Sequence, residues 1–219
     1  TLSSSSAASD VYKRQGVDMS HYYDEQPNVK SNQKKISYYF NQTQLEFTTD
    51  AGVFSKDRVD FGSDLLIQTF LKEHPPGPSK SIADVGCGYG PIGLTIAKVS
   101  PHHRITMLDV NCRALALAEM NQTKNQIDNA TIIESECLSA VEVQFNYILT
   151  NPPIRAGKDV VHRIFEEAFA HLKEAGSLYV VIQKKQGMPS AKKRMEELFN
   201  NVEVVTKSKG YYILKSSKG

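Results

Sequence analysis

The stretch DVGCGYGPIG, residues 84–93, decides the fold of this chain. It directly follows a run of β-forming residues at 81–85 and opens a helical pattern at 91–99. Glycine permits positive φ angles and lets a ligand approach the backbone closely, and Pro91 suits the first turn of a helix. A glycine-rich turn from a strand into a helix is a common ligand-binding loop in α/β sheets. The stretch therefore predicts an α/β sheet with a binding site beside this loop.

The chain on both sides of the loop alternates between β-rich and helical patterns. Strands are predicted at 81–85, 104–109, 130–134, 145–150, 177–183, 202–206 and 211–215, and helices at 91–99, 112–125, 159–173 and 189–199. This alternation is typical of a doubly wound parallel sheet. The link at 207–210 is too short for a parallel crossover and suits an antiparallel hairpin. We predict a Rossmann-like, seven-stranded sheet, mostly parallel with one antiparallel strand near the C-terminus.

The chain before the core divides into two further segments. Residues 1–18 are rich in Ser and Ala and lack the apolar stretch of a secretory signal, so we expect a disordered tag added before Met19. Residues 19–78 are expected to form an N-terminal arm that packs on the core. This arm contains a β-hairpin within 36–54 and an amphipathic helix over 63–73, which ends at the prolines of 75–78. Residues 79–219 form the predicted core.

The composition excludes several classes of protein. Of the 219 residues 40% are hydrophobic and 23% are charged, which is typical of a globular domain. The apolar runs are too short to span a bilayer, so we expect a soluble protein without a membrane partner. Three cysteines without a C-x-x-C pair favour a reducing cytoplasm and predict neither a disulfide framework nor a metal site. The net charge of +2 is too small to indicate nucleic-acid binding by itself.

Two ligand classes fit the glycine loop. Gly88, Gly90 and Gly93 satisfy the G-x-G-x-x-G pattern of nicotinamide dinucleotide sites. However, Asp84 lies beside the loop, where its carboxylate would repel a pyrophosphate and attract an ammonium or sulfonium group. We therefore favour a cationic ligand over a dinucleotide.

Carboxylates follow the next two predicted strands. Asp109 ends the strand at 104–109, where an acidic residue can accept hydrogen bonds from both hydroxyls of a ribose. Glu136 and Cys137 follow the third strand at a place suited to an adenine ring. Each has a simpler interpretation: Asp109 as a helix cap and Glu136 as a solvated loop residue.

The fourth strand, 145–150, runs into Asn151-Pro152-Pro153-Ile154. Two prolines cannot continue a ladder, so a rigid turn is expected at the ligand-binding edge of the sheet. The nitrogen of a purine amine or side-chain amide is a poor nucleophile, because its lone pair is delocalised. If the Asn151 side-chain oxygen and the Pro152 carbonyl accept its N–H groups, they stabilise the positive charge that develops on alkylation. A plain strand-ending turn is the alternative.

With these motifs in place, the sequence resembles the class I S-adenosylmethionine-dependent methyltransferases. More narrowly, it resembles the ribosomal RNA small-subunit methyltransferase C family in a single-domain form. The resemblance covers about residues 36–215 and rests on four motifs: DVGCGYGPIG, LDVN at 108–111, NPPI, and GVFSKDRVDFGSDLL at 52–66. The last of these is similar to the segment that packs over the donor in that family. It implies S-adenosylmethionine as the cofactor, S-adenosylhomocysteine as the product, and no metal. The implied donor-binding residues are Asp84, Gly86, Cys87, Gly88, Gly90, Asp109, Val110, Glu136, Cys137 and Asn151.

The resemblance also implies the reaction and its partner. Asn151, Pro152 and Pro153 are the expected catalytic residues for N-methylation of guanine N2 in ribosomal RNA, free or in the small subunit, by a cytoplasmic monomer or homodimer. Ile154 stands where related enzymes place an aromatic residue, so base stacking worth roughly 1–3 kcal/mol is lost there. The expected substrate-binding residues, which would contact the base or its phosphates, are Ile154, Arg155, Lys158, Lys184 and Lys185.

Three other functions stay open at this point. Asn-Pro-Pro also suits methylation of a glutamine amide in a translation factor, although such enzymes usually carry Tyr after the prolines and a helical N-terminal domain. A catalytically silent RNA-binding scaffold would not need Asp84, Asp109 and Asn151. A dehydrogenase is the third alternative.

Overall fold

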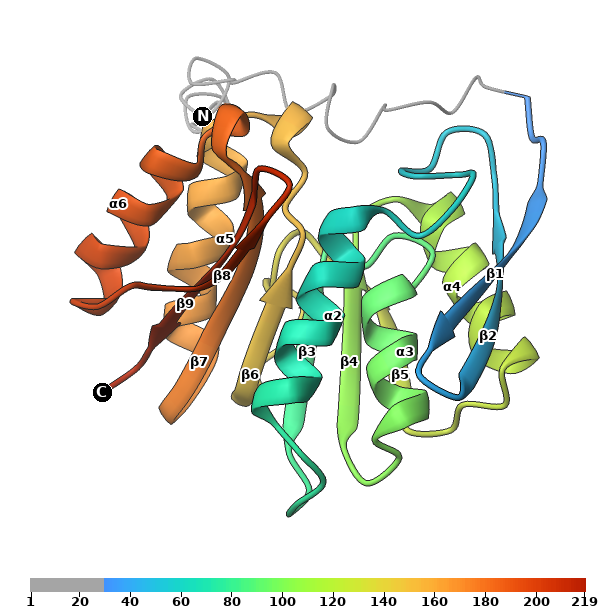
Figure 1. Ribbon diagram of the computed structural model, residues 1–219, viewed down its shortest axis with the longest axis horizontal. Helices are drawn as coiled ribbons and strands as arrows, with labels where there is room; N and C mark the ends of the chain where they lie inside the picture. Colours follow the sequence, from blue (N-terminus) through green and yellow to red (C-terminus); the bar gives the residue numbers. More distant parts are fainter. Residues whose placement is uncertain (1–29) are drawn as a thin grey trace, which may run out of the picture.

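The computed structural model describes residues 30–219 (Figure 1). The tag expected at 1–18 and the start of the arm lie outside the described residues. A seven-stranded sheet has the order β5-β4-β3-β6-β7-β9-β8, and β9 runs antiparallel to both of its neighbours while β3 to β7 are parallel. The predicted fold class is therefore confirmed. The strands are β3 (Ser81–Val85), β4 (Arg104–Asp109), β5 (Ala130–Glu134), β6 (Phe145–Thr150), β7 (Leu172–Gln183), β8 (Glu203–Ser208) and β9 (Tyr211–Ser217).

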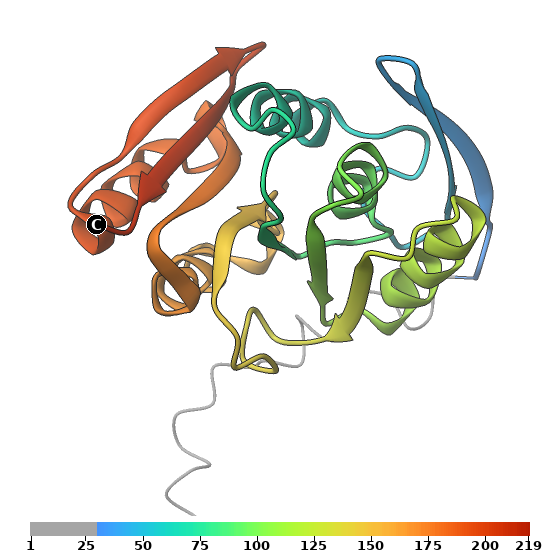
Figure 2. The same ribbon diagram turned by 90° about the horizontal axis from the view of Figure 1, so that it is seen from below.

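Helices cover both faces of the sheet (Figure 2). One face packs against α2 (Phe61–Glu73), α3 (Pro91–Val99) and α4 (Cys112–Lys124), and the other packs against α5 (Lys158–His171) and α6 (Met188–Phe199). Alternate residues of each strand enter opposite clusters, as expected for a buried strand: Leu149 packs in the first cluster and Ile148 in the second. Single-turn helices η2 (Ile154–Ala156) and η3 (Lys184–Gln186) follow β6 and β7.

The hairpin of β1 (Lys34–Phe40) and β2 (Thr43–Thr49) forms a separate two-stranded sheet beside α4 (Figure 1). Its edge is covered by side chains of α4 and of the residue that caps it, instead of another strand. The amide of the fully buried Asn121 accepts from Thr48 N at 2.6 Å and donates to Thr48 O at 3.0 Å, so it imitates a ladder partner. Asn125 makes the same pair of bonds to Glu46. These contacts fix the hairpin, and hence the loop that follows it, on the core.

Several boundaries differ from the predictions by a few residues, and two of these differences have a clear physical reason. Helix α2 begins at Phe61 instead of 63, because Asp60 caps it by accepting a hydrogen bond from Ser63 N at 3.1 Å. Strand β7 begins at Leu172 instead of 177, since Leu172 is fully buried and pairs with Phe145 across an irregular register. The residues that follow Leu172 are KEAG, which carry little β-propensity, so tertiary pairing extends the strand. No helix within residues 30–219 is long and apolar enough to cross a membrane.

Candidate functional site

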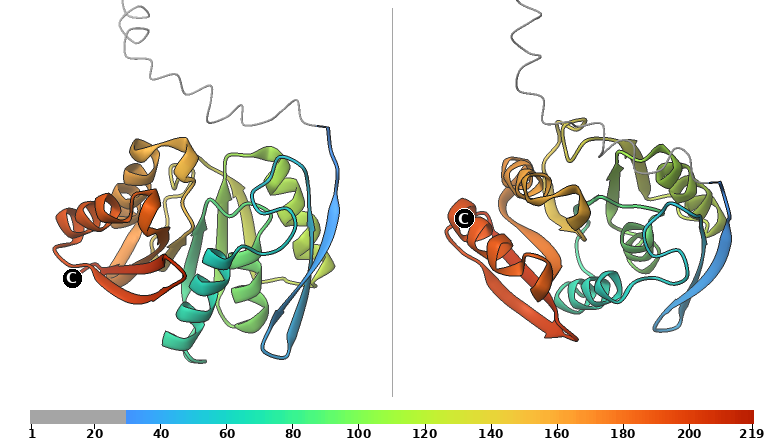
Figure 3. Two further views of the ribbon diagram at one scale, coloured as in Figure 1. Left: turned by 45° about the horizontal axis from the view of Figure 1, so that its top comes forward. Right: turned by 90° about the horizontal axis from the view of Figure 1, so that it is seen from above.

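The glycine loop and the Asn-Pro-Pro turn meet at the carboxyl ends of β3 and β6 (Figure 3). Val85 lies opposite Thr150, whose hydroxyl donates to the Val85 carbonyl at 2.8 Å. A Cβ placed on Gly86 would lie 4.0 Å from Cδ of Pro153. The chain leaves β3 for helices on one face and leaves β6 for helices on the other, and such switch points are where open α/β sheets bind ligands.

The glycines of the loop have different surroundings. Gly86, Gly88 and Gly90 all have positive φ angles, of 74°, 58° and 97°. A Cβ on Gly88 would meet no atom within 4 Å, whereas one on Gly90 would lie 2.6 Å from Cδ1 of Leu94. Gly88 therefore borders open space that a ligand can enter, and Gly90 permits close packing of the loop on α3.

Asp109 fastens the loop to the end of β4. Its carboxylate accepts from Gly88 N at 2.8 Å and from Asn111 N at 2.9 Å, and burial raises its pKa. A carboxylate offers about four lone-pair positions, so Asp109 retains acceptor capacity for a ligand diol. Val110 lies half-buried at the same edge. Asp109 thus orders the loop and can still accept hydrogen bonds from a ligand.

Asp84 lies beneath the loop with an unsatisfied oxygen. The side chain is 1% exposed, and its Oδ2 accepts from Gly93 N at 2.8 Å. Its Oδ1 is buried without a hydrogen-bond partner among residues 30–219. Burial raises the pKa of Asp84 to about 7, and the nearby charge of Asp109 acts in the same direction. An unpaired buried carboxylate oxygen is costly, so this position suits a cationic ligand group or a bound water.

The raised pKa of Asp84 predicts a pH-dependent stability. Because the folded state binds this proton more tightly than the unfolded chain, stability falls as pH rises from the unfolded pKa toward the folded one. The Asp84→Asn variant lacks this titrating group. Between about pH 4 and about pH 8, the free energy of unfolding should therefore fall by roughly 2–4 kcal/mol more in the unsubstituted protein than in Asp84→Asn. Urea denaturation of both proteins across this range measures the difference, and parallel pH profiles would contradict the assignment.

The loop after β5 is clamped by α5. Glu136 accepts from Nη1 of Arg163 at 2.5 Å, and Nε of the same guanidinium donates to Glu167 at 2.7 Å. The other oxygen of Glu167 accepts from Leu138 N at 2.7 Å. Glu136 thus lies at the predicted edge, but its charge is already paired. Sequence reasoning missed Arg163 and Glu167, because nothing in the local pattern of α5 points to a loop so distant in the chain.

The two candidate cysteines pack inward. Cys87 is 4% exposed in the first hydrophobic cluster and Cys137 is 5% exposed in the second. Burial raises the pKa of the Cys137 thiol to about 12 and also raises that of Cys87. Both thiols therefore stay protonated and serve packing, and a ligand beside these residues would meet mainly their backbone.

Asn151 is oriented by the start of α2. Its amide nitrogen donates to Oγ of Ser63 at 3.1 Å and lies 3.3 Å from Oδ2 of Asp60. The amide oxygen is then free to accept a hydrogen bond from a ligand. The carbonyl of Pro153 accepts from Ala156 N at 2.9 Å, whereas the Pro152 carbonyl accepts none from the described backbone. Asn151 and Pro152 therefore present two acceptors. Asp60 and Ser63 were missed by sequence reasoning, since their spacing indicates only a helix cap.

The expected substrate-binding residues follow β6 and β7. Ile154 is half-buried and packs against the second hydrophobic cluster. The cationic members are all exposed: Arg155 in η2, Lys158 at the start of α5, and Lys184 and Lys185 in η3. They stand at the carboxyl edge of the sheet, around the Asn-Pro-Pro turn.

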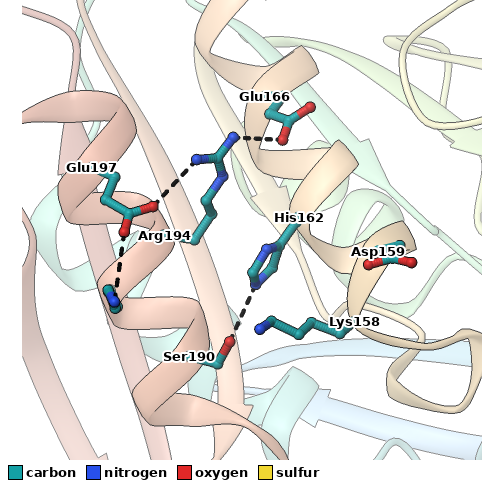
Figure 4. Close-up of a pocket in the computed structure, with 8 residues that line it drawn as sticks. Lys158, Asp159, His162, Glu166, Ser190, Arg194 and Glu197 are labelled. Atoms are coloured by element: carbon teal, nitrogen blue, oxygen red, sulfur yellow. Dashed lines mark hydrogen bonds and ion pairs between the residues drawn. The ribbon is translucent and has the colours of Figure 1, made fainter.

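A cleft of about 470 Å³ lies between α5 and α6, and its lining includes Lys158 of the expected substrate-binding set (Figure 4). Arg194 bridges Glu166 and Glu197 there, with N–O distances of 2.7 and 3.2 Å, and His162 lies 3.3 Å from Ser190. The glycine loop contributes no residue to this lining. Arg194 and Lys193 pair with the glutamates of the cleft, so these charges are explained by the packing of α5 against α6. Within residues 30–219, no cluster of three or more His, Cys, Asp or Glu side chains could hold a metal ion.

Comparisons with known proteins agree with this geometry. The model of the methyltransferase small domain family matches residues 44–215. The uncharacterized protein YbxB of Bacillus subtilis is 52% identical over 90% of this chain and 98% of its own length. Ribosomal RNA small subunit methyltransferase C of Erwinia tasmaniensis is 31% identical over 80% of this chain, and large subunit methyltransferase G of Shewanella putrefaciens is 30% identical over 84%. The chain spans 50% and 49% of these two relatives.

The fold is shared with a solved Thermus thermophilus enzyme, a 16S rRNA N2 methyltransferase in complex with AdoMet and guanosine. Its TM-score is 0.78 at 23% identity, covering 88% of this chain and 52% of that one. The resemblance inferred from the glycine loop and the Asn-Pro-Pro turn is confirmed by the family match. The chain belongs to the methyltransferase small domain family.

Proposed function

We propose that this protein is an S-adenosylmethionine-dependent N-methyltransferase that acts on an exocyclic amine of RNA, namely guanine N2 of ribosomal RNA. The observation that carries the proposal is the pair of free acceptors, Asn151 Oδ1 and the Pro152 carbonyl, beside a glycine loop that is open at Gly88. The named ribosomal RNA methyltransferases among its relatives, and the neighbour that holds AdoMet and guanosine, support the same choice.

The residues of the loop fit the proposed donor. The unpaired Oδ1 of Asp84 suits the ammonium group of its methionine part, Asp109 suits the ribose hydroxyls, and the open side of Gly88 allows close approach. When bound, S-adenosylmethionine supplies an electrophilic methyl group on a positively charged sulfur. A dinucleotide fits less well, because its pyrophosphate would lie near two carboxylates.

Asn151 and Pro152 would act on the acceptor nitrogen. Their oxygens accept its two N–H groups, which aligns the nitrogen and stabilises the positive charge that develops as its lone pair is used. Asp60 and Ser63 keep the amide of Asn151 in the required orientation. A strong base is not required, since the amine becomes acidic as it is alkylated and can release its proton to solvent.

The proposed substrate is ribosomal RNA, free or in the small subunit, in the cytoplasm. The test is transfer of labelled methyl from S-adenosylmethionine to naked ribosomal RNA, isolated small and large subunits, transfer RNA and release factors. We expect label on ribosomal RNA that maps to guanine N2. Label on a release factor alone would replace this function with glutamine methylation. Absence of donor binding would favour the silent scaffold, whereas donor binding without transfer would mean that the true substrate is not in this panel. Protection from melting by NADH and not by S-adenosylhomocysteine would favour a dehydrogenase.

The exposed lysines of η3 predict a salt effect on RNA binding. Replacing Lys184 and Lys185 with glutamine should reduce the slope of log affinity against log salt by about 1.4, because each phosphate contact with a single strand contributes about 0.7. The matched control replaces the exposed Lys72 and Lys173 at the opposite edge of the sheet, which changes the net charge equally. Titrations at several salt concentrations measure both slopes, and equal slopes for the two double variants would refute phosphate contacts by η3.

A further inference from the structure

The loop at 51–59 contacts α4 and the glycine loop and leads to the residue that contacts Asn151. Its first residue, Ala51, accepts a hydrogen bond from Arg113 of α4 at 2.9 Å, and the Ser55 carbonyl accepts one from the hydroxyl of Tyr89 in the glycine loop at 3.5 Å. The loop leads directly into Asp60, which contacts Asn151. It therefore extends from the start of α4, past the glycine loop, to the Asn-Pro-Pro turn (Figure 3).

The backbone of this loop is held in one shape by hydrogen bonds. The buried Asp50 accepts from Ala51 N at 2.7 Å and from Asn32 N at 2.6 Å. The hydroxyl of Thr49 donates to the Lys56 carbonyl at 2.5 Å, and that of Ser55 donates to the Arg58 carbonyl at 2.6 Å. Val53 packs against the first hydrophobic cluster. A loop anchored in this way can position a side chain precisely enough to bind a ligand.

Phe54 is the side chain that this loop leaves exposed. It is 71% exposed, more than any other large apolar side chain of the described residues. One exposed apolar residue needs no explanation by itself. However, Phe54 follows an inward-facing Val53 on a fixed loop at the edge of a site where Ile154 offers no aromatic ring. The exposed cationic residues Lys56 and Arg58 follow it on the same loop.

We propose that the ring of Phe54 stacks on the target base and holds it against Asn151, in place of the aromatic residue that is absent at Ile154. This inference rests on the proposed function and adds a residue that binds the acceptor. Aromatic side chains stack on any base, because every base has a π-face, and alanine substitution of such a side chain weakens binding by about 5- to 150-fold. The exposed Lys56 and Arg58 suit the phosphates that flank a base in that position.

The test compares the binding of guanosine and of inosine, which lacks the N2 amine, to the full chain in the presence of S-adenosylhomocysteine. Phe54→Ala should weaken both nucleosides at least fivefold, and Phe54→Trp should keep both near the unsubstituted affinity. Tyr39→Ala is the matched control: Tyr39 is 63% exposed on the hairpin, and its change should alter neither affinity. Asn151→Ala should weaken guanosine but not inosine, which separates stacking from recognition of the amine.

Each other outcome overturns a defined claim. If Phe54→Ala binds both nucleosides as tightly as the unsubstituted protein, the stacking role is wrong while the proposed function stands. If Phe54→Ala weakens S-adenosylhomocysteine instead, as measured in a separate titration, the ring contacts the adenine of the donor and the acceptor role is wrong. If the unsubstituted protein binds neither nucleoside but methylates a protein, both the guanine function and this inference are wrong.

Discussion

Replacing Asn151 with alanine is expected to lower the rate of methyl transfer by about 100- to 1,000-fold, the loss typical when one preorganised group is removed from a transition-state site. The substitution removes an acceptor that α2 holds in place through Ser63 and Asp60. The Asn151 oxygen stabilises the target amine most strongly as the amine nitrogen becomes positively charged. We therefore expect kcat to fall far more than the affinity for the RNA substrate. Single-turnover transfer of labelled methyl to ribosomal RNA measures the effect.

Two controls separate this loss from damage to the fold or to the donor site. Binding of S-adenosylhomocysteine to Asn151→Ala should stay within about threefold of the unsubstituted value, because we propose that the glycine loop and Asp109 provide most of the donor contacts and Asn151 few of them. Ser63→Ala removes one hydrogen bond from Asn151 but leaves Asp60, so its rate should fall by only about 3- to 10-fold. A rate for Asn151→Ala within threefold of the unsubstituted protein would exclude the proposed role.

The first four strands of the seven-stranded sheet could be predicted from the sequence alone. The bounds of β3, β4, β5 and β6 agree with the predicted runs, because short apolar segments between turn residues are typical of strands buried on both faces. The bounds of the later strands β7, β8 and β9 agree less well with the predictions. The start of β7 depends on pairing of Leu172 with Phe145, a contact that local propensity does not encode.

The position of the candidate site could be predicted from the sequence, but the contacts that orient its side chains could not. Asp109 and Asn151 lie where the motifs place them, since both follow strands whose carboxyl ends share one edge. The partners of Asn151 could not be predicted, because Asp60 lies 91 residues away in the chain and the contact is tertiary. The pairing of Glu136 with Arg163 was hidden for the same reason. Sequence patterns name the residues that end strands, whereas the contacts that orient them depend on packing.

The glycines of the loop look equivalent in the sequence, but their different roles depend on packing that the sequence does not show. Gly90→Ala is expected to destabilise the fold by about 2–5 kcal/mol. The φ angle of Gly90 is 97°, and the new Cβ would lie 2.6 Å from Cδ1 of Leu94 and 2.9 Å from Cε of Met107. Both of these side chains are fully buried and have little room to move. Denaturant unfolding measures the loss of stability.

Gly88→Ala is the matched substitution with the opposite expectation. Its φ angle of 58° lies in the left-handed region, and its Cβ would meet no atom within 4 Å, so the cost to stability should be only about 1–2 kcal/mol. The added methyl group would occupy the open side of the loop, where the donor must approach the backbone. We therefore expect a folded variant whose affinity for S-adenosylhomocysteine falls at least about tenfold, equivalent to about 1.4 kcal/mol. An unchanged affinity of Gly88→Ala for S-adenosylhomocysteine would mean that the donor does not approach the backbone at Gly88 and binds elsewhere.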